Sequence, residues 1–295
     1  MTNHQCSDLE HLDLEGAIAC YLVDGPEPTI IDPGPTTTLT RLIEELSVRG
    51  IGPRDLRRVL LTHIHLDHAG ATGDLLEVFP EARVFVHEDG ASHLVDPARL
   101  VSSTRRTFGD LHDRLWGEVK PVESNRLDVW RSDERPASIA GLRPISTPGH
   151  IAHHLSYLDE RDGTLFSGDA MGIVLSGGPQ HPPTPPPAVN LPDWFRTLQE
   201  IGEIGPERFG ATHFGLHGDV EDRRLQLRER LELLERRVRA AIDEGREEED
   251  AAAFEREVRQ ELAPFMGEDR VNRYFDMFPA ATDWAGVMFY VKRNP

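Results

Sequence analysis

Three histidines and one aspartate stand within six residues of one another, in the segment His63-Ile64-His65-Leu66-Asp67-His68. Groups of this kind are costly to bury unless something pairs with them. A metal ion is such a partner, and neutral imidazole with carboxylate suits zinc, and also iron, nickel or manganese. In a tight turn, His63 and His65 can serve one ion while Asp67 and His68 serve a neighbour. The segment therefore predicts a metal site rather than a polar helix cap.

Three further candidates each stand in a turn after a predicted strand. They are His150 in Ser-Thr-Pro-Gly-His, Asp169 in Leu-Phe-Ser-Gly-Asp and His213 in Ala-Thr-His. Each is a weak signal alone, but all three share a position at a strand end. Strand ends on one edge of a sheet converge in space, so these side chains can complete a site begun at His63.

The elements that must position these residues alternate between strand and helix. A buried strand over 57–63 ends at the histidine cluster, and a helix over 69–78 follows it. Further strands are expected over 17–23, 29–31, 82–87, 138–147, 153–159, 164–169 and 209–212, and helices over 38–49, 91–120 and 194–204. This order predicts a mixed α/β architecture.

The composition changes near residue 218. Apolar residues then recur at helical spacing among arginines and glutamates, first at Leu227, Leu231, Leu234, Val238 and Ile242 and then from Phe254 to Phe265. Two amphipathic helices are expected, with the acidic run 247–250 as a solvated connection and 286–293 as a short apolar tail. We interpret 1–217 as a catalytic domain and 218–295 as a mainly helical extension packed on it. The apolar residues on one side of these helices favour packing in the core. Alternatively, the helices could form a roof over the site or a dimer contact.

A Pro-rich segment over 177–190 follows Asp169 and cannot form a regular element. Two interpretations are equally open for it. It can form a stiff wall of the pocket, with His181 pointing in, or a surface connection without a role.

The sequence resembles the metallo-β-lactamase superfamily, and especially its glyoxalase-II-like and lactonase-like hydrolases. The motif HxHxDH stands here as THIHLDHAG, and the later motifs stand as TPGH at 147–150, SGDA at 167–170 and THFG at 212–215. Their order agrees over about residues 17–215. The resemblance implies a four-layer αββα sandwich of the α/β (α+β) class, with the metals at one edge and a C-terminal helical extension beyond the motifs.

The resemblance also implies the ligands of two ions. The first ion takes His63, His65 and His150, the second takes Asp67, His68 and His213, and Asp169 bridges them. It further places Asp32, in Ile-Ile-Asp-Pro-Gly, just behind the ligands, where a carboxylate orients imidazoles. On local chemistry alone, a plain turn residue before Pro33 is an equal interpretation of Asp32.

The chain departs from the family after TPGH. Many members continue with Thr and then Gly-Ser or Gly-Cys, whereas this chain has Ile151-Ala152-His153-His154. Contact of these two histidines with substrate or with the metals is one interpretation; we expect instead that one forms a hydrogen bond behind the ligands and that the other starts the next strand. The basic residues with which glyoxalase-II-type enzymes hold glutathione have no match here, which argues against a glutathione thioester as substrate.

The charge and composition argue against some binding partners and locations of the protein. The chain has 32 lysines and arginines and 51 aspartates and glutamates, which gives a net charge of -19. This charge repels phosphate backbones and argues against nucleic acid as a binding partner. No apolar run approaches the roughly 18 residues of a membrane span, and the first residues do not resemble a signal peptide. Cys6 and Cys20 are expected to be free thiols. A cytoplasmic protein is therefore expected.

The function expected from these residues is hydrolysis. Two divalent ions, zinc by preference with iron or manganese as alternatives, lower the pKa of a shared water, which attacks a carbonyl. Asp67 is the expected proton carrier, or else only a ligand. The substrate is expected to be a small ester, thioester, lactone or amide, and a homodimer stays open. Two alternatives are a mononuclear iron oxygenase of the persulfide-dioxygenase kind, which uses His63, His150 and Asp169, and a non-catalytic metal-binding protein.

Overall fold

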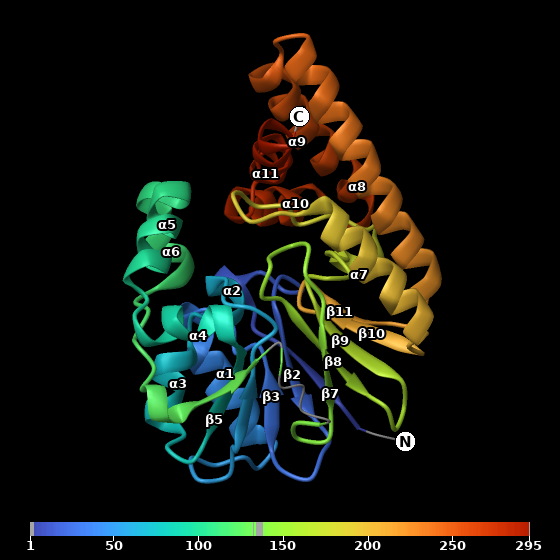
Figure 1. Cartoon of the computed structure of the whole chain (residues 1–295). Coiled ribbons are helices and arrows are strands. Elements are labelled where there is room, and N and C mark those ends of the chain that lie inside the picture. Colours follow the sequence, from blue (N-terminus) through green and yellow to red (C-terminus); the bar gives the residue numbers. More distant parts are fainter. Residues whose placement is uncertain (1–2, 132, 134–137, 295) are drawn as a thin grey trace.

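Two β-sheets lie face to face, and helices cover both outer faces (Figure 1). The computed structural model describes residues 3–131, 133 and 138–294. Between the sheets, an apolar layer includes Tyr21 and Phe85 of the first sheet and Tyr157 and Phe166 of the second. Alternate residues of a strand point to opposite faces, so each sheet feeds this inner layer and a second core under its helices. The predicted four-layer αββα sandwich is confirmed.

The first sheet contains the N-terminal strands in sequence order. They are β1 (Gln5–Asp8), β2 (Ala19–Val23), β3 (Thr29–Ile31), β4 (Arg58–Leu60), β5 (Arg83–His87) and β6 (Leu127–Trp130). The first three strands pair antiparallel, and β3 to β6 pair parallel. Parallel pairing needs crossover connections, and the helices between these strands supply them.

The second sheet has the order β11-β10-β9-β8-β7. Its strands are β7 (Arg143–Ser146), β8 (Leu155–Asp159), β9 (Thr164–Gly168), β10 (Arg208–Ala211) and β11 (Gly215–His217). Only β9 and β10 pair parallel among these neighbours. The crossover between them contains the Pro-rich segment and helix α7 (Leu191–Ile204), so the connection that follows Asp169 returns over the outer face of this sheet.

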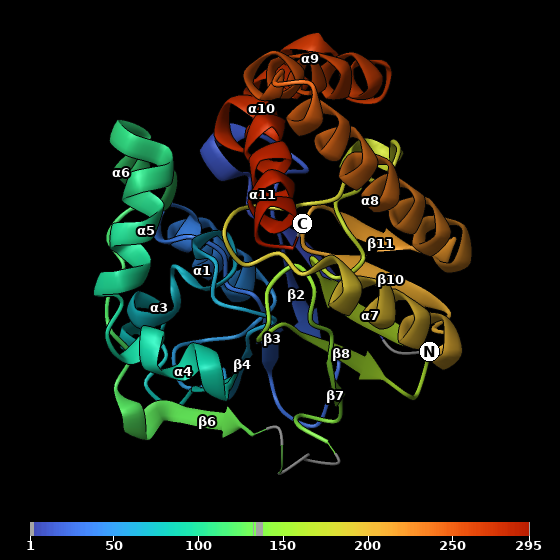
Figure 2. The same ribbon diagram turned by 45° about the horizontal axis from the view of Figure 1, so that its top comes forward.

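Helices α1 (Leu39–Val48) and α3 (Thr72–Val78) pack on the first sheet, and the short helix α2 (Leu66–Ala69) follows the histidine cluster. The helix predicted over 91–120 is three helices: α4 (Glu88–Val95), α5 (Ala98–Phe108) and α6 (His112–Trp116). Pro97 precedes α5, and Gly109, with a φ of 54°, follows it. In Figures 1 and 2, α5 and α6 stand apart from the C-terminal helices, beyond the same edge of the sandwich.

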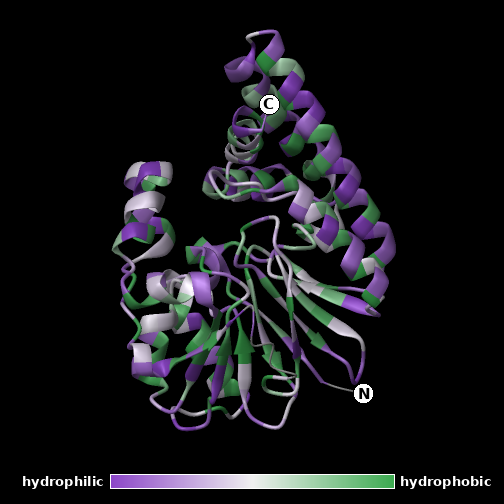
Figure 3. Ribbon diagram, viewed as in Figure 1, coloured by the Kyte–Doolittle hydropathy of each residue, from purple (hydrophilic) through white to green (hydrophobic). Residues whose placement is uncertain are grey.

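The C-terminal part is helical throughout, with α8 (Val220–Asp243), α9 (Glu247–Met266), α10 (Glu268–Met277) and α11 (Ala280–Arg293). Leu227 and Leu231 of α8 are buried in the same core as Phe209 of β10, as core packing predicts. Along α8 in Figure 3, hydrophilic residues alternate with hydrophobic ones, and Leu225 and Leu233 are exposed. The division into 1–217 and 218–295 stays a prediction.

Two details of the sequence interpretation were wrong. The acidic run 247–250 is the first turn of α9 and not a connection, because acidic side chains stabilise the positive end of a helix dipole. The apolar stretch 286–293 lies within α11 and not in a tail. Within the described part of the chain, no helix is long and apolar enough to cross a membrane.

Candidate metal centre

The predicted ligands converge at one edge of the sandwich from four separate segments. The cluster His63 to His68 follows β4, His150 follows β7, Asp169 follows β9 and His213 follows β10. Their side chains form three groups, and within each group the ligand atoms lie within 4.8 Å of one another. The strand ends therefore bring these residues together as expected.

The first group is His63, His65 and His150, and its nitrogen atoms face a common point. His65 Nδ1 lies 2.9 Å from His63 Nε2 and 2.9 Å from His150 Nε2. On its other side, His150 Nδ1 lies 2.7 Å from the carbonyl oxygen of Pro183. An N–H at Nδ1 donates to that carbonyl, so the lone pair of Nε2 faces the group.

The second group is Asp67, His68 and His213. Asp67 Oδ2 lies 3.2 Å from His213 Nε2 and 3.8 Å from His68 Nε2. His213 Nδ1 lies 2.7 Å from the carbonyl oxygen of Ala17, which fixes its tautomer as Pro183 fixes that of His150. Both groups thus present imidazole lone pairs from rings that are held on their far sides.

Asp169 lies between the two groups. Its Oδ2 is 3.4 Å from His150 Nε2 in the first group, and its Oδ1 is 3.5 Å from His68 Nε2 in the second. This is the position expected of a bridging carboxylate. Metal binding by these seven residues stays a prediction.

The chemistry of the donor set fits divalent cations. In the described ranges, His68 Nε2 and Asp169 Oδ1 are buried and have no hydrogen-bond partner. Buried polar atoms are rarely left so, and a cation between them would satisfy both. Burial and the neighbouring His150 imidazole lower the pKa of His65 to about 3, so its ring is neutral and able to bind an ion. Burial lowers the pKa of His68, but Asp169 and Asp67 outweigh it and raise that pKa, so the position attracts positive charge.

Asp32 orients this site from behind. Its buried carboxylate lies 2.7 Å from His68 Nδ1 and accepts hydrogen bonds from Thr62 N at 2.8 Å and Thr62 Oγ1 at 2.7 Å. Thr212 Oγ1, one residue before His213, donates to it at 3.2 Å. The backbone of Asp32 has a φ of 52°, in the left-handed region that few non-glycine residues adopt and that Asp and Asn tolerate best. These contacts favour the orienting role over a plain turn residue.

His154 supports Asp169. Its Nε2 accepts a hydrogen bond from Asp169 N at 3.2 Å, and its Nδ1 lies 2.7 Å from Thr147 Oγ1. The expected hydrogen-bonding role behind the ligands is therefore confirmed for His154. The other half of that prediction was wrong, because β8 begins at Leu155 and neither histidine starts it.

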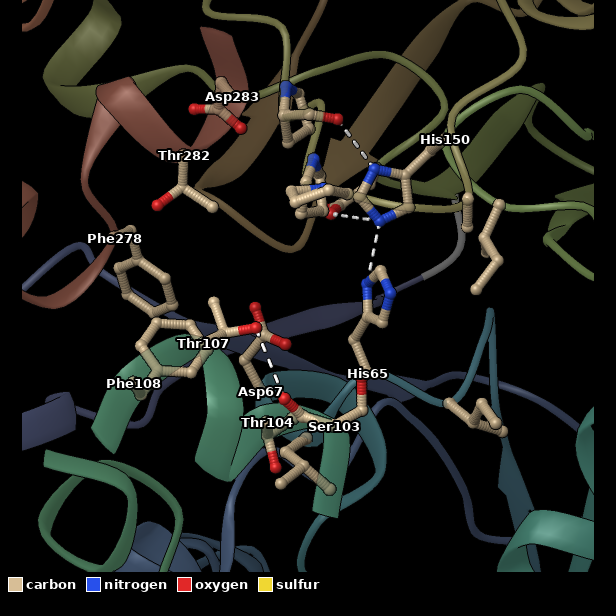
Figure 4. A pocket seen from close by; sticks show the side chains of 18 of the residues that line it. His65, Asp67, Ser103, Thr104, Thr107, Phe108, His150, Phe278, Thr282 and Asp283 are labelled. Carbon is tan, nitrogen blue, oxygen red and sulfur yellow. Dashed lines mark hydrogen bonds and ion pairs between the residues drawn. The ribbon is translucent and has the colours of Figure 1, made fainter. Parts of the chain in front are cut away.

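A cavity of about 510 Å³ opens onto both groups. Figure 4 shows Ser103, Thr104, Thr107 and Phe108 of α5 on one side and Phe278, Thr282 and Asp283 of the C-terminal part on another. The Pro-rich segment also lines it, with Pro183, Pro185, Pro186, Pro187 and His181. This segment is therefore a wall of the pocket, His181 is among the lining residues, and the C-terminal helices contribute to the roof. Sequence reasoning missed the residues of α5, whose only signal was their spacing along one helix face.

Comparisons with known proteins agree with this geometry. The family model described as "Metallo-beta-lactamase superfamily" matches residues 14–213. The metallo-beta-lactamase fold-containing protein ST1585 of Sulfurisphaera tokodaii is 32% identical over 162 residues, which cover 54% of this chain and 60% of that protein. Its crystal structure superposes with a TM-score of 0.64 over 78% of this chain and 86% of the other, at 24% identity.

Two relatives carry activities in their names. The probable metallo-hydrolase YqjP of Bacillus subtilis is 27% identical over 65% of this chain and 65% of its own length. The atrochrysone carboxyl ACP thioesterase of Aspergillus fumigatus is 24% identical over 90% of this chain and 73% of its own length. The sequence matches to ST1585 and YqjP thus span less than two thirds of each relative. Because the family model covers more than half of the chain and all seven predicted ligands, the protein belongs to the metallo-beta-lactamase superfamily.

Proposed function

We propose that this protein is a hydrolase that uses two divalent metal ions, zinc by preference, to cleave a small ester, thioester, lactone or amide. The observation that supports it most directly is the pair of complete ligand groups on either side of Asp169. A mononuclear site would need only one of these groups. The free thiols Cys6 and Cys20 agree with the cytoplasmic location expected from the sequence.

When bound, the ions would supply an acidified water and would stabilise negative charge on a carbonyl oxygen. The first would be held by His63, His65 and His150, and the second by Asp67, His68 and His213. Burial raises the pKa of Asp67, but the neighbouring His68 and His213 outweigh it and lower that pKa, so the group is a carboxylate at neutral pH. Asp67 lines the cavity, and a carboxylate there can accept a proton from the attacking water.

The cavity favours a substrate with an apolar part. Phe108, Trp116 and Phe278 line it together, with ring centroids of Trp116 5.3 Å from Phe108 and 5.8 Å from Phe278. Phe278 also lies 5.5 Å from the ring of His213, so this aromatic cluster stands beside the second ligand group. Such a surface packs against an alkyl or aromatic group next to the scissile bond. The thioesterase name of one relative supports a thioester among the candidates.

The first test is the metal content of the purified protein by elemental analysis. The same sample is then screened with esters, thioesters, lactones and amides that carry apolar acyl groups. We expect two ions per chain and turnover of at least one class. His65→Ala and Asp169→Ala should each lose metal and activity together, because each removes a ligand. His217→Gln, at a half-buried histidine outside the site on β11, is the matched control and should keep both.

Other outcomes would replace the proposal. One iron per chain, with oxygen uptake on a persulfide, would identify the oxygenase that uses His63, His150 and Asp169. Full metal loading without turnover of any of the four substrate classes would favour a binding protein. If the protein neither retained metal nor took it up on titration, the dinuclear site itself would be refuted.

A further inference from the structure

A turn near the N-terminus leads directly to a contact of the second ligand group. This N-terminal turn, residues 10–16, lies between β1 and β2, and Ala17 follows it. The carbonyl oxygen of Ala17 is 2.7 Å from His213 Nδ1 and fixes the ring of that predicted ligand. A displacement of the turn would therefore disturb the support of a metal ligand.

The backbone of the N-terminal turn has several left-handed residues. Glu10, Leu12 and Asp13 have φ values of 46°, 51° and 61°, and Gly16 has a φ of 72°. Glycine adopts this region freely and aspartate tolerates it, but leucine and glutamate seldom adopt it. Such a backbone persists only where its surroundings hold it. The contacts around the turn therefore decide whether it keeps this shape.

Two arginines of α10 supply such contacts. Arg273 Nη2 donates hydrogen bonds to the carbonyl oxygens of Leu12 at 2.8 Å and Asp13 at 3.1 Å, so it bridges two consecutive left-handed residues. Arg270 Nη2 donates to the carbonyl oxygen of Glu15 at 2.7 Å. Because Arg270 and Arg273 are three residues apart in a helix, they lie on the same face of α10.

A second support closes the base of the turn from β1. The carboxylate of Asp8 accepts hydrogen bonds from Glu10 N at 3.0 Å and from Gly16 N at 2.7 Å. Three consecutive residues are thus held by three different elements. Glu15 is held by α10 and Gly16 by Asp8, and Ala17 contacts the ligand His213. The support from α10 therefore lies two residues from the carbonyl that orients His213.

The same helix also contacts the second ligand group itself. The hydroxyl of Tyr274 is 3.3 Å from His213 Nδ1, and the ring centroid of Phe278, which follows α10, is 5.5 Å from that of His213. Tyr274 and Phe278 both line the cavity. The first ligand group has a different support, since His150 Nδ1 lies 2.7 Å from the carbonyl oxygen of Pro183 in the Pro-rich segment.

We propose that Arg270 and Arg273 are positioning residues for the second metal ion, and that they act on His213 through the N-terminal turn and Ala17. This inference rests on the proposed function, because it requires two ions, and it specifies how one of them is retained. Linkage between binding and local order is reciprocal. The bound ion should therefore protect the N-terminal turn and α10 from local opening.

The first test measures the two metal-binding steps separately by chelator competition. His65→Ala and His213→Ala identify the two steps, because each removes a ligand of one group. We expect the double variant Arg270→Ala with Arg273→Ala to weaken the step that His213→Ala abolishes by about tenfold, the lower end of the range for partners behind a ligand. The step that His65→Ala abolishes should stay as in the parent. Arg273→Lys, which keeps N–H donors, should lose less than Arg273→Ala.

The matched control is Arg239→Ala. Arg239 lies on α8, pairs with Glu235 and donates a hydrogen bond to the backbone carbonyl oxygen of Asn294 at 3.3 Å. This variant also removes an arginine that contacts a backbone carbonyl, but it should leave both binding steps unchanged. A double variant that loses both steps equally would show general destabilisation and would overturn the proposal. Parental affinity for both ions in the double variant would overturn it as well.

Hydrogen exchange gives a second readout that does not depend on turnover. In the parent, metal loading should slow the exchange of the amides of residues 10–17 and of α10, and the double variant should lose most of this protection. Exchange in Arg239→Ala should follow the parent. If the parent takes up no second ion, the proposed function fails and this inference fails with it. If both ions bind and the turn exchanges equally fast in parent and double variant, the positioning role alone is refuted.

Discussion

The carboxylate of Asp283 on α11 lies 2.8 Å from His181 Nε2 in the Pro-rich segment. Its other oxygen accepts a hydrogen bond from Thr184 N at 2.7 Å, and Thr184 Oγ1 donates to the carbonyl of Asp283 at 2.8 Å. Pro183 lies between His181 and Thr184 in the sequence, and its carbonyl oxygen is 2.7 Å from His150 Nδ1. The last helix of the chain therefore holds the segment that orients a predicted metal ligand.

Replacement of Asp283 by alanine should loosen this segment. We expect Asp283→Ala to cost about 2 kcal/mol of stability, because it leaves His181 and Thr184 N without their acceptor. Metal affinity should fall by up to about tenfold, since the carbonyl behind His150 is no longer fixed. Chelator competition and denaturant unfolding measure the two effects.

Asp276→Ala is the matched control for Asp283→Ala. Asp276 lies on α10, is exposed and pairs with Arg259 at 3.0 Å. An exposed pair contributes at most about 1 kcal/mol, so this variant should bind metal as the parent does. Unchanged metal affinity in Asp283→Ala would show that the link to α11 does not act on His150.

Asp32→Asn tests the carboxylate behind the ligands. Asparagine tolerates the left-handed backbone at a φ of 52°, so the substitution changes the side chain and not the turn. One amide oxygen cannot accept from Thr62 N, Thr62 Oγ1 and the His68 ring together, so the orientation of His68 should be lost. We expect metal affinity to fall about tenfold to a hundredfold, the range for such outer partners. A variant with parental metal affinity in chelator competition would leave Asp32 as a turn residue only.

Tyr274→Phe should have a smaller effect than Asp32→Asn. The hydroxyl of Tyr274 on α10 lies 3.3 Å from His213 Nδ1, but that nitrogen is already 2.7 Å from the carbonyl of Ala17. The shorter contact, with Ala17, sets the tautomer of His213, and the contact with the phenol hydroxyl is weaker. We expect a loss of about threefold in metal affinity by the same chelator competition. A loss as large as that of Asp32→Asn would mean that α10 and not Ala17 orients His213.

The sequence could predict the site because its ligands are local motifs at strand ends. The turn that follows a buried strand is short, so His63, His150, Asp169 and His213 had to lie at that edge once the sheets formed. The edge strands β1, β6 and β11 were not predicted, because polar residues interrupt each of them, whereas the equally short β3 and β4 adjoin unbroken apolar residues.

The cavity could not be predicted, since its walls come from segments far apart in the chain. His181 and Asp283 are 102 residues apart, and no local pattern indicates that they meet. The bounds of α5 were also missed, because a continuous helix was predicted over 91–120.

His11 offers a test of stability against pH. Its ring is fully buried and stacks on Trp116 at 5.8 Å with an interplanar angle of 5°, and neither ring nitrogen has a hydrogen-bond partner within the described residues. Burial lowers the pKa of His11 from 6.5 to about 4. The native ring therefore stays neutral where the unfolded ring takes a proton. Stability is then lost as pH falls from 6.5 to 4, by up to about 3 kcal/mol, because one pKa unit corresponds to about 1.4 kcal/mol.

His11→Phe should remove this dependence and keep the stacking. At pH 7.5 the variant should be at least as stable as the parent, because two unpaired ring nitrogens are replaced by carbon. At pH 4.5 it should be more stable by about 2 kcal/mol, since the parent alone loses stability to the protonated unfolded ring. Denaturant unfolding of both proteins with chelator, from pH 4.5 to 7.5, keeps metal release out of the comparison. Parallel curves over this range would mean that His11 is charged in the native protein, or that a buried partner satisfies its ring.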